Sequence, residues 1–173
     1  MTEQLRFEWV YQVSPLATFR MATRLEHLEA KAQHLGHERH SVLELRERDG
    51  VFRSITQRQV DVEMPLWASR LFKPRNMIKQ TQLWQPPSWD GGRRYEAVVE
   101  VSGMPVRIYG GGELTPVGFG ETRYTISLTI SSKARLIGRR LEQLVTGALE
   151  RNINGEHEFR LLWLQRKAPS GSI

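Results

Sequence analysis

Polar and small residues interrupt the apolar stripe of the longest helix-like segment, in the stretch ALERNINGEHEF at 148–159. Asn152 offers an amide that can orient a ligand by hydrogen bonds, while Glu156 and His157 can exchange protons. Such an acid or base, paired with a tyrosine, would serve a cyclase, dehydratase or hydrolase-like reaction. The pairing would have to be spatial, because catalytic groups meet in the fold and not in the sequence.

The same stretch permits two interpretations of the backbone. In the first, one helix continues through it, and Ala148, Asn152 and Gly155 remove volume where a cavity would lie. In the second, Asn154 and Gly155 end one helix and start another, because glycine costs roughly 1 kcal/mol in a helix interior. The apolar stripe resumes in phase at Phe159, which favours one continuous helix whose central inward residues are small or polar.

Arg58 is a second candidate for ligand contact. On the predicted strand 51–63, the alternation that buries Val60 and Val62 passes through Arg58. A buried arginine needs a carboxylate partner, which either Glu156 on the facing helix or the acidic headgroup of a ligand can supply. The alternative, which we favour, is a bulge that leaves Arg58 solvated at the end of the sheet.

Five aromatic side chains fall on the apolar faces of predicted strands. They are Trp9, Tyr11, Trp84, Tyr95 and Tyr124. Aromatic residues on such faces belong to the core by default, since they bury a large apolar area. Those near the wide end of a cavity can instead form its walls, where the tyrosine hydroxyl groups can form hydrogen bonds with a ligand. All five are therefore candidates for a cavity wall.

In the segment 64–76, Trp67, Leu71 and Phe72 lie between two prolines, and basic residues are interleaved with them and follow them. This pattern is typical of a short interfacial helix. Such a helix can act as a lid, as a portal that touches a membrane surface transiently, or as a dimer contact. The alternative is a capping loop that only closes the edge of the sheet.

Signals for metal, cofactor and nucleophile chemistry are weak. The chain has no cysteine, and the cluster His34, His37 and His40 lacks the H-E-x-x-H spacing of a zinc site. Its glycine-rich segments complete neither G-x-G-x-x-G nor a P-loop, so the glycines at 110–112 are better explained by a bulge or bend. We expect no metal, no cofactor and no catalytic residue that local sequence can identify.

Charge and hydropathy limit the partners and the compartment. The net charge of +6 comes from 25 Lys and Arg scattered among 19 Asp and Glu, without long runs of one sign. We therefore expect no nucleic-acid partner. The apolar runs are too short for a membrane span and the N-terminal residues do not resemble a signal peptide, which with the lack of cysteine predicts a cytoplasmic protein.

The spacing of apolar residues predicts the elements that position these side chains. A strand at 7–13 alternates with period two, and Ser14-Pro15 and Thr23 can begin two short helices. About six strands follow, and a helix at about 135–166 ends the order. This order predicts an α+β helix-grip fold, a curved antiparallel sheet of about seven strands wrapped around a long C-terminal helix. We expect one domain at 1–167 and a disordered tail at 168–173.

The order of elements and several motifs resemble the START-like superfamily, also called the birch-pollen-allergen or polyketide-cyclase superfamily. Within it, the chain is similar to an uncharacterised bacterial family. The matching segments are VSP at 13–15, TQLWQPP at 81–87, YEAVVEVSGMPVRIYGGGELTP at 95–116, and IGRRLEQLV through EHEFRLLWL at 137–164. The resemblance implies a hydrophobic cavity between the sheet and the C-terminal helix, and it implies no particular chemistry.

Three functions stay open on this basis. The leading prediction is a protein without enzymatic activity that binds a lipid-like or polycyclic small molecule in that cavity, as a monomer or a homodimer. An enzyme of the cyclase, dehydratase or hydrolase-like kind would use the same cavity. An interaction module with a filled core is the third, and it would dock partners through 64–76.

Overall fold

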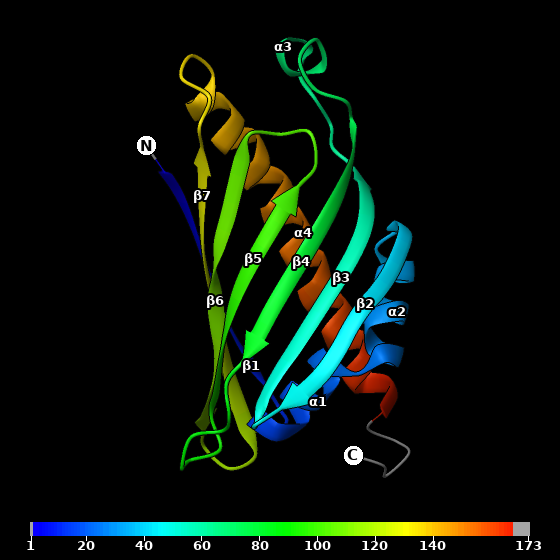
Figure 1. Cartoon of the computed structure of the whole chain (residues 1–173). Coiled ribbons are helices and arrows are strands. Elements are labelled where there is room, and N and C mark those ends of the chain that lie inside the picture. Colours follow the sequence, from blue (N-terminus) through cyan, green and yellow to red (C-terminus); the bar gives the residue numbers. More distant parts are fainter. Residues whose placement is uncertain (1, 168–173) are drawn as a thin grey trace.

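A seven-stranded antiparallel sheet curves around one long helix (Figure 1). The computed structural model describes residues 2–167. The elements are, in order, β1 (Thr2–Tyr11), α1 (Pro15–Thr23), α2 (Leu25–His34), β2 (Glu38–Arg48), β3 (Val51–Asp61), α3 (Leu66–Ser69), β4 (Arg75–Trp84), β5 (Arg93–Val101), β6 (Val106–Val117), β7 (Glu121–Ser132) and α4 (Gly138–Lys167). Across the sheet the order is β1-β7-β6-β5-β4-β3-β2, so the predicted α+β helix-grip fold is confirmed.

Local sequence explains how these elements begin and end. The Ser14 side chain accepts a hydrogen bond from the Ala17 amide at 3.2 Å, and Pro15 occupies the first turn of α1, where its missing N–H costs nothing. Asp49 and Gly50 both adopt positive φ, at 52° and 79°, as a tight hairpin between β2 and β3 requires. The meander therefore starts where turn chemistry predicts it.

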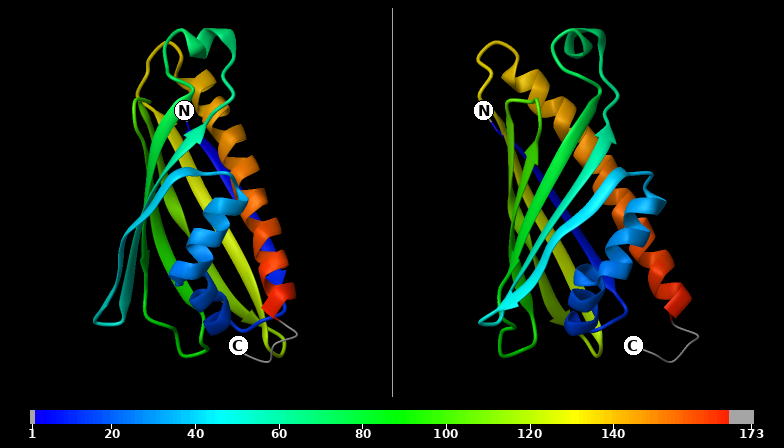
Figure 2. Two further views of the ribbon diagram at one scale, coloured as in Figure 1. Left: turned by 90° about the vertical axis from the view of Figure 1, so that its right-hand side faces the viewer. Right: turned by 45° about the vertical axis from the view of Figure 1, so that its right-hand side comes forward.

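The C-terminal helix α4 is continuous over 30 residues, so the break at Asn154 and Gly155 does not occur. At 1.5 Å per residue it is about 45 Å long and crosses the concave face of the sheet (Figure 2). Leu141, Val145 and Phe159 are buried on it, as its apolar stripe predicts.

The buried face of α4 also includes a side chain that the predicted stripe leaves out, Ile153. Aromatic residues fill one end of the core, around Trp84 and Tyr124, and α1 covers that end with Phe19. Aliphatic residues around Ile108, Ile130 and Leu141 form the core at the other end. Between the two ends, α4 and the sheet leave space for cavities.

The three glycines at 110–112 do not form a bulge, because β6 pairs with β5 and β7 without a register shift. A Cβ at Gly110 would collide with the carbonyl group of Ser127, and one at Gly111 with the carbonyl group of Tyr95. At Gly112 it would enter the ring of Tyr95. Glycine is needed here because the neighbouring strands approach closely where the sheet curves.

The segment between β3 and β4 contains only a single helical turn, α3, at one end of the sheet (Figure 1). Trp67 and Phe72 pack against the aliphatic end of the core, while Leu71 is 59% exposed. The roles of this segment as lid, membrane portal or dimer contact stay predictions.

No helix within residues 2–167 is long and apolar enough to cross a membrane. The predicted disordered tail at 168–173 lies outside the described residues.

Candidate ligand-binding site

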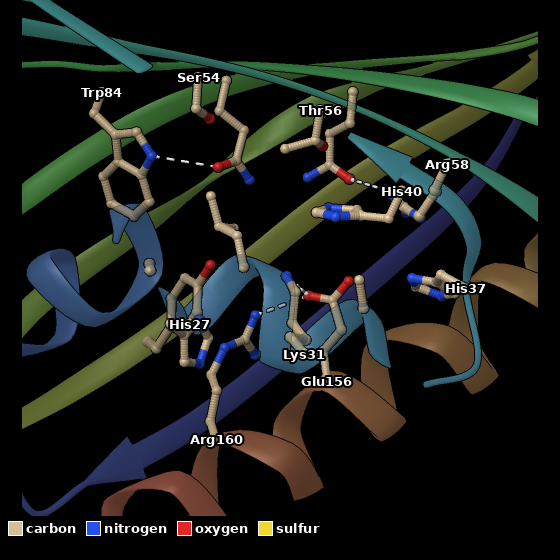
Figure 3. A pocket seen from close by; sticks show the side chains of 16 residues that line it. His27, Lys31, His37, His40, Ser54, Thr56, Arg58, Trp84, Glu156 and Arg160 are labelled. Atoms are coloured by element: carbon tan, nitrogen blue, oxygen red, sulfur yellow. Dashed lines mark hydrogen bonds and ion pairs between the residues drawn. The ribbon is translucent and has the colours of Figure 1, made fainter. Parts of the chain in front are cut away.

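A buried ionic cluster links α2 and α4 inside the fold, with Glu156 at its centre (Figure 3). Glu156 Oε2 accepts hydrogen bonds from Lys31 Nζ at 3.1 Å and from Arg160 Nη2 at 3.0 Å. Its other oxygen, Oε1, accepts from Asn152 Nδ2 at 3.0 Å. Only 12% of the Glu156 side chain and 6% of the Arg160 side chain are exposed. Three donors therefore hold this carboxylate away from solvent.

Arg58 is buried as well, so the solvated position that we favoured for it is wrong. The pairing of β3 with β4 has no register shift from Phe52 to Asp61, and the irregularities of β3 lie on its other side, toward β2. Arg58 thus keeps the inward parity of Val60 and is 7% exposed. Its Nη1 donates to Gln80 Oε1 at 3.2 Å, and its Nε has no hydrogen-bond partner among the described residues.

These groups surround a small polar cavity of about 30 Å³, which we call the inner chamber. Three cationic side chains line it, Lys31, Arg58 and Arg160, with Glu156 as the sole carboxylate among the described lining residues. Trp84 and Tyr124 close its floor toward the sheet. The chamber therefore carries an excess of positive charge in an environment that is largely shielded from water.

Three histidines line the chamber, His27, His37 and His40, and burial lowers the pKa of each. His27 is 1% exposed, and its ring centroid lies 5.3 Å from that of Phe159 and 5.1 Å from that of Trp163. Burial and the nearby Lys31 lower the pKa of His27 to about 3. Burial and Arg58 lower the pKa of His37 to about 4, although its hydrogen bond with Asn152 opposes this shift. Neither His27 nor His37 therefore adds charge at neutral pH.

Asn152 connects His37 to the ionic cluster. Since its amide nitrogen donates to Glu156, its Oδ1 must accept the hydrogen bond from His37 Nε2 at 3.0 Å. Neutral His37 therefore carries its proton on Nε2. The observed hydrogen bonds of Asn152 position Glu156 and His37, and its contact with a ligand stays a prediction.

A wider groove of about 480 Å³ opens beside the inner chamber, between α4 and strands β3 to β6. Its wall is mostly aliphatic, and the residues include Ile78, Val99, Val101, Met104, Ile108, Val145, Ala148 and Leu149. Arg58 and His37 line both the groove and the inner chamber, so they mark the junction between them. We call this space the outer groove.

The structure brings six of the ten predicted cavity residues to these two spaces. The inner chamber takes Arg58, Trp84, Tyr124 and Glu156, and the outer groove takes Arg58, Ala148 and Asn152. Gly155 lines neither space, since a Cβ there would lie 2.9 Å from Leu35 Cδ2. It permits close packing of the end of α2 on α4, whereas Ala148 and Asn152 line the outer groove.

The remaining three predicted residues, all aromatic, line neither space. Trp9 stacks on His157 with ring centroids 4.5 Å apart, and the Tyr11 hydroxyl group lies 2.8 Å from His157 Nδ1. Tyr95 and Tyr124 share a hydrogen bond between their hydroxyl oxygens at 2.9 Å. Burial raises the pKa of Tyr95 and of Tyr124, so both stay protonated. The pair Tyr11 and His157 therefore lies away from the inner chamber and the outer groove.

Glu156 is poorly suited to proton transfer. Although burial would raise its pKa, Lys31, Arg160 and Arg58 together hold that pKa well below its usual range. A carboxylate that stays ionised and accepts three hydrogen bonds has little capacity left as an acid or a base. Its arrangement suits the positioning of the surrounding cations. Among residues 2–167, no group of three His, Asp or Glu side chains is placed to hold a metal ion.

Sequence reasoning missed Lys31, His27, His37 and Arg160 as site residues. A local signal exists for Arg160, because it follows Glu156 by four residues on one helix and can pair with it. No local signal joins Lys31 to Glu156, which lie 125 residues apart. Only the docking of α2 against α4 brings them together.

The free energy of unfolding should fall as the pH drops from about 6.5 toward 4, and His27→Phe should make this fall shallower. The lowered pKa of His27 means that the unfolded chain binds a proton in this window while the folded protein does not. The neutral histidine therefore contributes its full stability above pH about 6.5. Below that pH, each such histidine makes the free energy of unfolding fall by about 1.4 kcal/mol per pH unit. Urea unfolding at several pH values measures the slope.

The matched control for this prediction is Gln33→Phe. Gln33 is exposed on α2, six residues after His27, and its side chain does not titrate. It should keep the slope of the unmodified protein, and equal slopes for His27→Phe and the unmodified protein would contradict the prediction.

Comparisons with known proteins agree with this architecture. Residues 6–164 match the family model described as a protein of unknown function, DUF2505. An uncharacterized protein of Mycobacterium tuberculosis is 25% identical over 118 residues, which cover 67% of each chain.

Solved structures share the fold at low sequence identity. The Zhui aromatase/cyclase from Streptomyces sp. R1128 superimposes with a TM-score of 0.69 at 12% identity and full coverage of both chains. The lipid transfer and protein localization domain of human StarD13 gives 0.58 at 15% identity, covering 90% of this chain and 76% of that domain. With the family model spanning residues 6–164, the chain belongs to the DUF2505 family, and it shares its fold with these solved structures.

Proposed function

We propose that the protein binds an amphipathic small molecule, with its apolar body in the outer groove and its polar end at the junction with the inner chamber. The observation that carries this proposal is that Arg58 and His37 line both spaces, so the outer groove adjoins the inner chamber at these two side chains. An aliphatic wall that ends at buried charged groups matches a ligand with one apolar and one polar part.

The dimensions of the outer groove support the binding of a small molecule. Its volume of about 480 Å³ falls within the range of roughly 300–1,000 Å³ that is usual for such sites. Apolar ligand area buried against Val99, Met104 and Leu149 would contribute roughly 25 cal/mol per Å². A ligand that left its polar end in this aliphatic part would lose hydrogen bonds to water, so the junction is the favoured place for that end.

The nature of the structural neighbours is consistent with this proposal. One is an aromatase/cyclase and another a lipid transfer domain, and both share the sheet and the long helix that enclose the groove. The paired, ionised state of Glu156 favours binding over acid or base catalysis at this place.

Nile red, a neutral dye that fluoresces in apolar surroundings, tests the groove directly. The unmodified protein should bind it, and Val99→Phe should weaken binding by about tenfold or more, because the new ring occupies ligand volume. Val98→Phe is the matched control, since Val98 is the neighbouring residue on β5 and is 42% exposed on the opposite face. It should leave dye binding unchanged.

A second variant separates blocked binding from damaged folding. Ala148→Phe fills the same groove from α4, and it should weaken dye binding while the thermal unfolding transition remains cooperative. Failure of the unmodified protein to bind Nile red, or equal loss in Val99→Phe and Val98→Phe, would overturn the proposed function.

A further inference from the structure

We infer that the polar end of the ligand is an oxyanion the size of a carboxylate, and that Arg58 is the residue that selects it. This inference rests on the proposed function and specifies the chemical class of the ligand. The charges of the inner chamber, the free hydrogen-bond donor of Arg58 and the size of the chamber support it separately.

The charges around the inner chamber do not balance. Lys31, Arg58 and Arg160 are cationic, and Glu156 is the one carboxylate that lines the chamber within the described residues. Both oxygens of Glu156 are already engaged by other donors, and Arg58 makes no hydrogen bond to it. An uncompensated cation with so little access to water is unfavourable, so an anion beside Arg58 would be stabilised.

Arg58 also has donor capacity to spare. It is 7% exposed, its Nη1 binds the neutral amide of Gln80, and its Nε has no partner within residues 2–167. A guanidinium group in this state can offer parallel N–H donors to a planar oxyanion. Because Arg58 faces both spaces, it can meet the end of a molecule that lies in the outer groove.

The exposed lining of the outer groove carries more negative than positive charge. Glu38, Asp61 and Glu63 are its exposed carboxylates and Arg151 its exposed cation, and Asp61 also pairs with Arg75 at 3.2 Å. An anionic end would be repelled at these carboxylates and attracted at Arg58, so the charges favour one orientation, with the anion inward.

The size of the inner chamber limits the anion. A volume of about 30 Å³ accommodates roughly two or three water molecules, which is comparable to a single carboxylate group. A phosphate diester with a second substituent does not fit there. We therefore assign a terminal carboxylate on an apolar chain or ring system.

Four ligands of equal chain length test the assignment by displacement of Nile red at neutral pH. They are decanoate, decan-1-ol, decylamine and decyl phosphate. Decanoate should displace the dye at a concentration about tenfold or more below that of decan-1-ol, because a charge-assisted hydrogen bond outweighs a neutral one. Decylamine should be the weakest, since it brings a fourth cation to the cluster.

Arg58→Met should abolish the preference for decanoate over decan-1-ol while leaving decan-1-ol itself unchanged. The matched control is Arg53→Met, on the same strand, with an exposed side chain that pairs with Glu44 at 3.7 Å. That variant should keep the preference. Since the ligand series is also measured on the unmodified protein, the inference remains testable if Arg58→Met does not fold.

The outcomes separate the inference from the proposed function. Equal displacement by decanoate and decan-1-ol, or an unchanged preference in Arg58→Met, would contradict the inference that Arg58 selects an oxyanion. Neither result would contradict the binding of an apolar molecule in the outer groove. Tighter displacement by decyl phosphate than by decanoate would overturn the carboxylate-sized assignment. If Nile red itself does not bind, the proposed function fails first.

Discussion

Replacing Glu156 with glutamine is expected to lower the free energy of unfolding by about 3–5 kcal/mol. In the folded protein this carboxylate accepts hydrogen bonds from Lys31, Arg160 and Asn152, and it is nearly inaccessible to solvent. Its loss leaves Lys31, Arg58 and Arg160 close together without a negative charge between them. Removing one partner of a buried ionic cluster is costly for this reason, even where the intact cluster adds little stability.

Urea unfolding of Glu156→Gln at neutral pH measures the loss, and Glu158→Gln is the matched control. Glu158 is exposed two residues further along α4, so its substitution should change stability by less than about 0.5 kcal/mol. Adding Lys31→Met to Glu156→Gln should restore part of the stability, because one of the uncompensated cations is removed. A loss for Glu156→Gln as small as that of the control would contradict the buried cluster.

The pH gives an independent check on the same carboxylate. Its cationic neighbours lower the pKa of Glu156 in the folded protein, so the stability it adds is present above the pKa of the unfolded chain, about 4.3. That contribution is lost as the pH falls further toward the folded value. The difference between the unmodified protein and Glu156→Gln should therefore narrow below pH about 4.

The fold could be predicted from sequence because its signals are local. Apolar and polar residues alternate along β7, where Tyr124, Ile126 and Leu128 are buried, and the capping pair Ser14-Pro15 predicts the start of α1. The same alternation along β3 puts Arg58 on the buried face with Val60. The sequence does not show whether a bulge interrupts this alternation, because a bulge depends on pairing with both neighbouring strands.

The site depended on contacts between distant segments, and there sequence reasoning reached less far. It singled out Glu156 and offered Arg58 as its charged partner, whereas the cations that donate hydrogen bonds to Glu156 are Lys31 and Arg160. The aromatic candidates show the same limit. Trp9 and Tyr11 have the inward parity that was predicted, but their side chains contact His157 on α4 and line neither the inner chamber nor the outer groove.

Trp84→Ala is expected to have a comparably large effect, a loss of about 3–5 kcal/mol in the free energy of unfolding. Trp84 is 0% exposed, and its ring lies 4.3 Å from that of Tyr95 and 5.3 Å from that of Phe19 between centroids. Truncation removes a large apolar group and leaves a cavity that opens into the inner chamber. The control is Trp89→Ala, where the side chain is 98% exposed, and its effect should stay within about 0.5 kcal/mol.

Indole can test whether the lost stability comes from the cavity itself. The Trp84 indole donates from Nε1 to Gln82 Oε1 at 3.3 Å, and free indole can make the same bond within the cavity of Trp84→Ala. It should raise the melting temperature of that variant and leave those of the unmodified protein and Trp89→Ala unchanged, because a ligand stabilises only the state it binds. An equal shift in all three proteins would mean that indole binds elsewhere. No shift in Trp84→Ala would mean that the aromatic end of the core collapses into the space, in which case the inner chamber depends on Trp84 for its shape.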